Sequence, residues 1–422
     1  MSAADQQSAG SAEPGAARKL PRRGLLFGGA VAGLGALAAA GAQLTGTGGQ
    51  QPGNLAGAEP TESVHGGGVV PFPGDRQAGI TTTAQAHGVF VALDLRPGTT
   101  RARAKALLRL LSDDAANLCA GHAALADTEG ELARVPARLT VTLGFGPGLF
   151  AAVDPARTPG WLKPLPAFSI DRLQAGFSDG DLLLQICADD PLTVAHAQRM
   201  LLKDSRSFAT VRWVQTGFRR SYGSEKSGTT MRNLFGQVDG TSNPAPDSTD
   251  YERVVWGSGK IPAWMDNDTS VVIRRIAMNL DKWDGVDRVG REESVGRRLS
   301  TGAPLTGTNE HDEPDFAAVS KLGFPVVSDV SHLRRARPKD SSQRIFRRAY
   351  NYDAAPGAGE VSHSGLIFVS YQADVDKQFT PIQRRLAELD MLNQWTTPIG
   401  SAVFAIPPGC REGGFVGEEL FG

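Results

Sequence analysis

The feature that most constrains the fold is an order of strand and helix patterns that the chain runs through twice. The first run opens at residues 88–95 with GVFVALDL, where Val89, Val91 and Leu93 alternate as in a half-buried strand. The patterns that follow predict a helix within 99–121, strands at 138–146 and 181–190, a helix opened by Pro191 and a strand at 210–218. This order, strand-helix-strand-strand-helix-strand, is the ferredoxin-like arrangement.

The second run repeats the order less cleanly. Its patterns predict a strand at 270–278, a short helix at 291–299, strands at 344–352 and 365–374, a helix at 380–395 and a last strand at 401–408. We therefore predict an α+β protein with two ferredoxin-like domains, 79–222 and 223–422, whose antiparallel sheets carry peripheral helices. A fold of this class does not identify a function.

The N-terminal residues have a different composition. Residues 1–44 contain a basic stretch with the pair Arg22-Arg23, a Gly- and Ala-rich apolar run, and Ala-x-Ala at 38–40 or 40–42. This layout predicts a twin-arginine signal peptide, with an uncleaved membrane anchor as the alternative. Residues 45–78, rich in Gly, Pro and Thr, are predicted to be a flexible linker. We expect a protein exported to the cell envelope or the medium, with the Tat translocase as partner during export.

Composition excludes several functions. Lys and Arg total 44 against 45 Asp and Glu, a balance that gives no reason to expect a nucleic acid partner. The three cysteines are widely spaced, so we expect buried thiols and no disulfide framework. The chain has no HExxH, GxSxG or phosphate-loop motif, which leaves zinc hydrolases, serine hydrolases and nucleotide hydrolysis without support.

Two segments carry the residues that could act in catalysis or bind a cofactor. NLFGQVDGTSNP at 233–244 holds Asp239 between Gly236 and Gly240, a pattern also typical of an ordinary turn. In the segment 328–352, His332 lies among several arginines, and more follow on a predicted strand. A neutral imidazole ligates haem iron, cations pair with propionates, and a distal acid and arginine act on a bound oxidant.

The motifs together resemble the dye-decolourising peroxidases, in particular the Tat-exported subgroup akin to deferrochelatases. The matching segments are RQAGITTTAQ (76–85), LTVTLGFGPGLF (139–150), GDLLLQICADD (180–190), RNLFGQVDGTSNP (232–244), QRIFRRAYNY (343–352), GLIFVSYQAD (365–374), FTPIQRRLAE (379–388) and GSAVFAIPPG (400–409). They cover nearly the whole chain beyond residue 75 in the expected order. The resemblance implies two ferredoxin-like domains, with one haem b in the C-terminal domain.

The resemblance also implies roles for individual residues. Asp239 corresponds to the catalytic acid of the family's Gly-x-x-Asp-Gly loop, and His332 to the proximal iron ligand. Arg347 corresponds to the distal arginine, although Arg348 beside it leaves the register open by one place. The other implied haem contacts are Gly236, Gly240, Thr241, Ser242 and Arg337. Two departures from the family pattern are Gln237-Val238 within the loop and Arg76 in place of a histidine.

The implied activity is reduction of hydrogen peroxide with one-electron oxidation of an organic reductant such as a dye or phenol. An aspartate base, with an ordinary pKa near 3.9, predicts an acidic optimum. Surface aromatics would pass electrons to bulky donors, the candidates being Tyr350, Tyr352, Tyr371, Trp213, Trp264 and Trp395. Each of these side chains more often packs in a core, and the sequence does not choose among them. Alternatives that use the same site are a haem carrier or deferrochelatase that releases iron from haem, and an accessory to an exported metal oxidase. Assembly into a homo-oligomer is left open.

Overall fold

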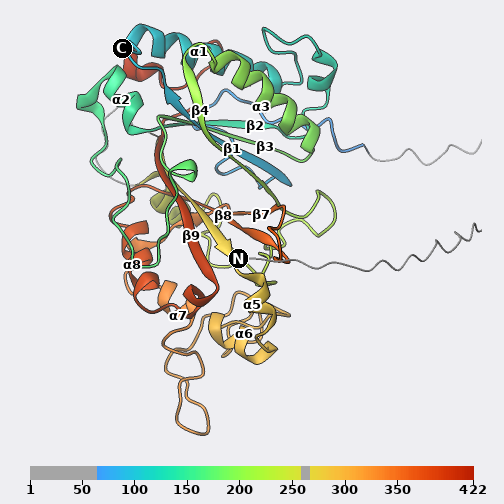
Figure 1. Ribbon diagram of the computed structural model, residues 1–422, viewed down its shortest axis with the longest axis vertical. Helices are drawn as coiled ribbons and strands as arrows, with labels where there is room; N and C mark the ends of the chain where they lie inside the picture. Colours follow the sequence, from blue (N-terminus) through green and yellow to red (C-terminus); the bar gives the residue numbers. More distant parts are fainter. Residues whose placement is uncertain (1–63, 258–266) are drawn as a thin grey trace, which may run out of the picture. The chain divides into compact units, whose positions relative to one another are not determined.

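The computed structural model describes residues 64–257 and 267–422 (Figure 1). The predicted signal peptide, residues 45–63 of the predicted linker, and Trp264 lie outside the described residues. Within the described ranges, no helix combines the length and the hydropathy required to cross a bilayer.

The secondary structure contains strands and helices in alternating groups. The strands are β1 (His87–Leu95), β2 (Thr140–Phe145), β3 (Leu182–Ala188), β4 (Ala209–Phe218), β5 (Thr269–Met278), β6 (Phe346–Arg347), β7 (Tyr350–Ala354), β8 (His363–Gln372) and β9 (Thr396–Ile406). The α-helices are α1 (Arg101–Cys119), α2 (Pro147–Val153), α3 (Pro191–Ser205), α4 (Thr249–Tyr251), α5 (Leu280–Asp284), α6 (Arg288–Val295), α7 (His332–Ala336) and α8 (Phe379–Leu389).

The sheet confirms the predicted α+β class and shows how the two repeats join. Across the sheet, the strands of the first repeat follow the order β4-β1-β3-β2, and those of the second follow β9-β5-β8-β7. Each repeat thus places its last strand beside its first, which is the ferredoxin-like order. The repeats meet through one residue pair at each end, Phe145 with Ala405 and Phe218 with Asn351. Because β5 also pairs with β8, the strands close into a barrel.

Barrel closure buries both faces of strands that the sequence analysis expects to be half-buried. In β1, Val89 and Val91 pack on the outside against the layer formed by α1 and α3. Phe90 and Ala92, on the opposite face, belong to a second core inside the barrel. The prediction for β1 is therefore wrong in this respect, because the second repeat covers the face that would otherwise meet water.

Helix ends follow local capping chemistry. The side chain of Thr100 caps α1, and that of Asp190 caps α3. The predicted helix 291–299 ends at Val295, since Gly296 adopts a left-handed backbone with φ 85°. The predicted helix 380–395 ends at Leu389 as α8, and a separate 3₁₀ turn follows Asp390, whose carboxylate accepts a hydrogen bond from the Leu392 amide. Both corrections lie beside the candidate site.

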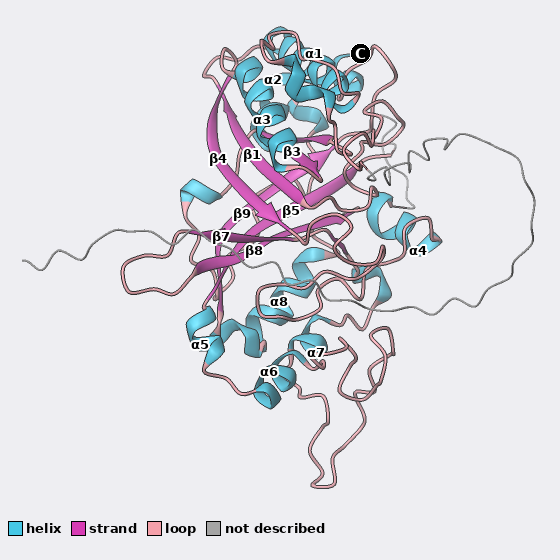
Figure 2. Ribbon diagram, turned by 90° about the vertical axis from the view of Figure 1, so that its right-hand side faces the viewer, coloured by secondary structure: helices cyan, strands magenta, loops and turns pink. Residues whose placement is uncertain are grey.

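The two repeats differ in what covers their sheets. Figure 2 shows α1, α2 and α3 at one end of the strands and α5, α6, α7 and α8 at the other. On β8, Ile367 and Val369 face the barrel interior, whereas Leu366 and Phe368 line a large cavity on the outer face. The short helices and long loops of the second repeat thus leave space over their sheet, where the first repeat has a packed helical layer.

Residues 71–77 of the predicted linker lie against the barrel. Phe72 is buried, and the Gln77 side chain exchanges two hydrogen bonds with the Leu143 backbone at 2.8 and 2.9 Å. The three cysteines are free and buried, as predicted. Burial raises the pKa of the Cys119 thiol to about 12, so this group is held as an unreactive thiol.

Candidate active site

His332 is the first residue of α7, and its ring is oriented by a carboxylate from the turn after α8. Its Nδ1 lies 2.6 Å from Oδ2 of Asp390, a side chain that is only 4% exposed. Burial lowers the pKa of His332, but the charge and hydrogen bond of Asp390 outweigh burial, and the net shift is upward. With Nδ1 engaged in this way, Nε2 is the nitrogen left to ligate a metal.

Asp239 is held by a compact loop that begins and ends in backbone hydrogen bonds. Arg232 pairs with Val238 across the loop, and the Asp239 amide donates to the Met231 carbonyl at 2.8 Å. Gly236 and Gly240 have φ values of 77° and 124°, which side-chain-bearing residues rarely adopt. A Cβ on either glycine would meet protein atoms only at ordinary distances, so the required feature is the backbone conformation.

Asp239 and Arg347 form an ion pair on the cavity wall. Nη1 of Arg347 lies 2.9 Å from Oδ1 of Asp239, and their side chains are 24% and 10% exposed. Nδ2 of Asn233 donates to the other carboxylate oxygen at 3.3 Å. The carboxylate is thus held by two donors with fixed positions, while both members of the pair still line the cavity.

Strand alternation resolves the one-place ambiguity at the paired arginines. Phe346 points into the barrel interior, so Arg347 points to the cavity and Arg348 returns to the interior. Arg348 is 2% exposed and donates to the Thr82 carbonyl and the Gln85 side chain. The backbone of Arg347 is fixed by Asn243, whose side-chain amide exchanges hydrogen bonds of 2.7 and 2.9 Å with it.

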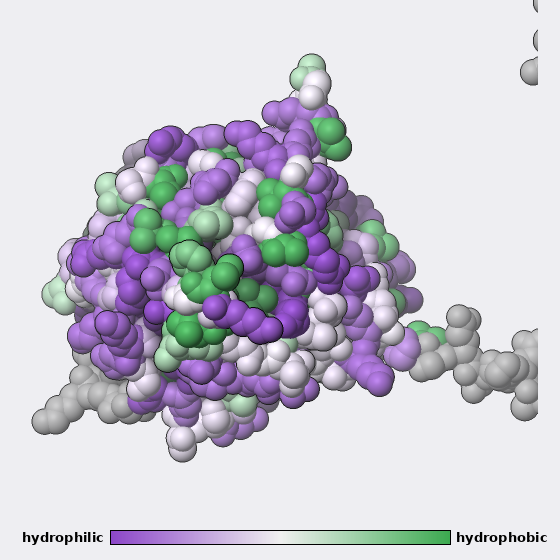
Figure 3. All heavy atoms as spheres, turned by 90° about the horizontal axis from the view of Figure 1, so that it is seen from below, coloured by the Kyte–Doolittle hydropathy of each residue, from purple (hydrophilic) through white to green (hydrophobic). Residues whose placement is uncertain are grey.

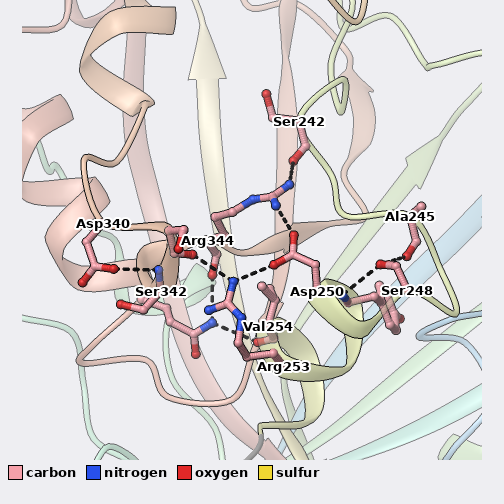
Figure 4. Close-up of polar contacts among 12 residues, drawn as sticks. Ser242, Ala245, Ser248, Asp250, Arg253, Val254, Asp340, Ser342 and Arg344 are labelled. Carbon is pink, nitrogen blue, oxygen red and sulfur yellow. Dashed lines mark hydrogen bonds and ion pairs between the residues drawn. The ribbon is translucent and has the colours of Figure 1, made fainter. Parts of the chain in front are cut away.

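A second arginine ties the loop after Asp239 to its surroundings (Figure 4). Arg344 donates from Nη2 to the Ser242 carbonyl at 3.0 Å and forms an ion pair with Asp250. Ser248 caps the short helix that carries Asp250, accepting from the Tyr251 amide. Because Arg344 also lines the cavity, its positive charge is held at the cavity wall.

The cavity has a volume of about 680 Å³ and a mixed lining. Its apolar wall includes Phe235, Ile276, Leu366, Phe368, Phe379, Ile382 and Leu386. This volume lies within the range of cofactor-sized pockets. His332 and the Asp239–Arg347 pair line the same space, and the charges of Arg347 and Asp239 both act on the pKa of His332.

The structure brings most of the predicted site residues to this one cavity. Asp239, Thr241, Ser242, His332, Arg337 and Arg347 line it, whereas Gly236 and Gly240 do not. The hydroxyl of Thr241 is engaged with Glu310 at 3.0 Å, and Arg337 forms an ion pair with Glu313. Sequence reasoning missed Asp390, Asn243 and Arg344. Asn243 and Arg344 lie in the matching segments 232–244 and 343–352, whereas Asp390 lies just beyond the segment 379–388.

The two departures from the family pattern fall in different places. Gln237 and Val238 line the cavity, so they can affect what binds there. Arg76 is not a lining residue; it forms an ion pair with Glu252 at 2.7 Å and lies 4.4 Å from the ring centroid of Trp256.

The predicted surface aromatics are mostly internal. Tyr350, Tyr352, Tyr371 and Trp213 are at most 3% exposed. The structure therefore confirms core packing for these four and contradicts a role for them as surface aromatics. Barrel closure buries them because they point into the space between the two repeats. Trp395 is half-buried and meets Trp283 edge-on, with ring centroids 5.1 Å apart.

Fold and site together define an α+β barrel in which a histidine held by a buried carboxylate and an acid–arginine pair line one cavity. Models of the two Dyp-type peroxidase domains match the chain, the N-terminal one at residues 77–219 and the C-terminal one at 230–411. The chain belongs to the Dyp-type peroxidase family.

Individual relatives agree with this assignment. A dye-decolorizing peroxidase of Thermobifida fusca is 38% identical over 82% of this chain and 83% of its own. The deferrochelatase of Escherichia coli K12 is 34% identical over 81% of this chain and 84% of its own. A crystal structure of a DyP-type peroxidase from Cellulomonas bogoriensis is 54% identical, with a TM-score of 0.82 over 85% of this chain and 99% of that one.

Proposed function

We propose that the protein is a haem b peroxidase in which His332 ligates the iron and Asp239 and Arg347 act on hydrogen peroxide. The observation that carries the proposal is that the Asp239–Arg347 ion pair lines the same cavity as His332. The residues fit haem: one histidine has a nitrogen available for iron, one wall is apolar, and Arg337 and Arg344 supply cations for the propionates.

The chain's own residues have separable tasks in this reaction. Asp390 accepts a hydrogen bond from Nδ1–H of His332, which fixes the tautomer and leaves Nε2 free to ligate iron. Asp239 takes a proton from the incoming peroxide and returns it to the departing oxygen. Arg347 orients that carboxylate and stabilises negative charge on the peroxide oxygens. Haem held by these residues would supply a redox-active iron through which two electrons pass, one at a time, from the organic reductant to hydrogen peroxide.

The test is an absorption spectrum of the purified protein before and after one equivalent of hydrogen peroxide. We expect a ferric haem spectrum that changes rapidly on addition of peroxide and recovers when a reductant is supplied. Failure to bind haem, even after reconstitution, would overturn the assignment of His332.

The role of Asp239 is tested with Asp239→Asn, which keeps the size of the side chain but replaces the carboxylate with an amide that cannot act as a base. We expect the rate of the peroxide reaction to fall by about 10²–10⁴-fold, measured by stopped-flow absorption. Asp281→Asn, at an exposed site on α5 away from the cavity, is the matched control. A wild-type rate in Asp239→Asn would show that this carboxylate is not the base.

Iron release from haem is the second candidate function, and the similarity to the Escherichia coli deferrochelatase supports it. Carrying haem requires only His332 and the cavity, whereas the ordered Asp239–Arg347 pair serves a reaction with peroxide. Haem that binds but shows no spectral response to peroxide would favour this second function.

We also propose that residues 1–44 direct export through the Tat pathway and that the protein acts in the cell envelope or the medium. The paired arginines, the apolar run and the Ala-x-Ala sites support this. Replacing Arg22 and Arg23 with lysines would then retain the protein in the cytoplasm, as fractionation would show. A homo-oligomer is compatible with this role, and sedimentation of the purified protein would reveal it.

A further inference from the structure

A second cavity of about 510 Å³ adjoins the large one. It is lined by Asp329, Arg334, Arg335, Arg337, Lys339, Asp340, Gln343 and Arg385. We call this cavity the arginine pocket. Arg337, Lys339 and Gln343 line both cavities, so a molecule in the arginine pocket would lie against the wall of the large cavity.

The arginine pocket carries a surplus of positive charge. Five cations face two carboxylates, and Asp329 is already paired with Arg334 at 2.9 Å. Arg335 and Arg337 have partners in Glu388 and Glu313, but these carboxylates are 68% and 71% exposed and are therefore strongly screened by water. No ion pair within the described part of the chain involves Lys339 or Arg385.

Arg385 is the best-placed group for an incoming anion. Nε donates to the Arg335 carbonyl at 3.3 Å and Nη1 to Oε1 of Gln343 at 2.8 Å. In return, Nη2 of Arg335 donates to the Arg385 carbonyl at 2.9 Å, so α7 and α8 hold each other's arginine. Nη2 of Arg385 is buried and has no hydrogen-bond partner among the described residues. A fixed guanidinium with an unused donor is suited to carboxylate or sulfonate.

The segment that carries Lys339 and Gln343 is also held in place. The Asp340 carboxylate accepts from the Ser342 amide at 2.8 Å, as Figure 4 shows, and Arg253 donates to the Ser341 carbonyl at 3.2 Å. The Arg344 carbonyl accepts from Gln378 at 2.8 Å. Lys339 and Gln343 therefore project from an anchored segment, and a ligand would bind there with little ordering of the chain.

We propose that the arginine pocket binds the carboxylate or sulfonate group of an aromatic electron donor and holds that donor at the wall of the haem cavity. The proposal rests on the peroxidase function proposed above. Each hydrogen peroxide takes one electron from each of two donor molecules, together with two protons from a phenolic donor or from solvent, and yields two waters. Arg337 and Arg344 would form ion pairs with the haem propionates, so Arg385 and Lys339 would remain available to bind the anionic group of the donor.

The test compares an anionic and a neutral donor in variants of the pocket. Arg385→Gln and the double variant with Lys339→Gln remove charge from the arginine pocket. Arg384→Gln is the matched control, because this neighbouring arginine on α8 is exposed and lines neither cavity. We expect the KM for the disulfonated donor ABTS to rise about tenfold in Arg385→Gln and further in the double variant. The KM for guaiacol, a neutral phenol, and for hydrogen peroxide should stay unchanged.

Salt provides a second readout. The KM for ABTS in the wild type should increase with ionic strength, and this dependence should weaken in the double variant but not in Arg384→Gln. An unchanged KM for ABTS in the double variant would overturn the proposal. Equal loss with both donors, in a variant that retains its haem spectrum and unfolding temperature, would also overturn it, because the residues would then act on the site generally.

Direct binding separates this proposal from the peroxidase function. Calorimetric titration with naphthalene-1,5-disulfonate, which is not oxidised, should show binding to the haem-loaded wild type and to Arg384→Gln but weak binding to the double variant. If the wild type binds this anion yet oxidises neither donor, the peroxidase function fails while the anion site stands. If it oxidises guaiacol but does not bind the anion, the arginine pocket proposal fails alone.

Discussion

At the scale of single residues, the contact between His332 and Asp390 links two segments that are 58 positions apart. The two oxygens of Asp390 have different partners. Oδ2 contacts the imidazole of His332, and Oδ1 accepts a hydrogen bond from the Leu392 amide at 3.0 Å. The substitution Asp390→Asn keeps the oxygen that serves Leu392 and removes the negative charge behind His332. It therefore tests the carboxylate with little change to the turn.

We expect Asp390→Asn to lower haem affinity by about 10–100-fold, since partners of this kind orient the ligand and raise its basicity. The iron–histidine stretching frequency should also fall, because a neutral amide leaves the imidazole less electron-rich. Resonance Raman spectroscopy and haem transfer to apomyoglobin measure the two effects. Asp376→Asn, on the exposed pair with Lys163, serves as control. An unaltered stretching frequency would contradict the assigned role of Asp390.

At the scale of secondary structure elements, the packing of α1 on α3 contains a carboxyl pair. Asp114 on α1 and Asp204 on α3 are 1% and 9% exposed, and each has a buried Oδ2 without a donor. Burial, and then the hydrogen bond and charge of Asp114, raise the pKa of Asp204 to about 7. A proton on Asp204 satisfies both carboxyl groups, so the two helices pack best while that proton is bound.

The pKa shift predicts the direction of a pH effect on stability. Asp204 has an ordinary pKa near 3.9 in the unfolded chain, so between about pH 4 and 7 only the folded state holds the proton. Its contribution is full below this range and is lost as pH rises through the folded pKa. We expect the unfolding temperature of the wild type to fall from pH 5 to 8 relative to that of Asp204→Asn. Parallel pH curves for the two proteins would refute this.

At the scale of the whole barrel, the two repeats depend on narrow contacts where their sheets meet. Gly217, next to the pair of Phe218 with Asn351, packs so closely that a Cβ would lie 2.6 Å from Cβ of Tyr350 and 3.0 Å from the Asn351 carbonyl oxygen. The junction therefore requires a residue without a side chain. Tyr350 and Asn351 lie on β7, and only two residues separate this strand from β6, which carries Arg347, so the junction and the site share one segment.

We expect Gly217→Ala to reduce the free energy of unfolding by about 1–3 kcal/mol through overpacking, as urea titration would show. Hydrogen exchange should speed up in peptides of both β1 and β8, because loosening the junction exposes both repeats. Gly160→Ala, where a Cβ would meet no atom within 4 Å, is the control. Faster exchange confined to the first repeat would mean that the repeats are stabilised independently.

The surface at the end of the molecule that carries α6 and α7 exposes several apolar side chains. Figure 3 shows hydrophobic groups gathered near the middle of this face, with hydrophilic side chains around them. Between α6 and α7, the long loop exposes Val319, Leu322 and Phe324 at 63–83%.

What the sequence determines is mainly local. Alternation and helical periodicity predict most long strands and α1, α3 and α8, because each of these elements buries a face that its own residues define. The order of elements then predicts two ferredoxin-like repeats, and the motifs around Asp239, His332 and Arg347 identify the family. The short helices α2, α5 and α7 lack enough turns to show a period, and sequence reasoning missed them.

The tertiary structure decides what depends on contacts between distant segments. Barrel closure buries both faces of β1 and hides the tyrosines expected at the surface. The side of β6 that faces the cavity distinguishes Arg347 from Arg348, and sequence motifs alone leave this open because the two arginines are adjacent. Asp390 reaches His332 only after α7 and α8 pack together. Side-chain identity is local, whereas the partner of each side chain is set by how the chain folds back on itself.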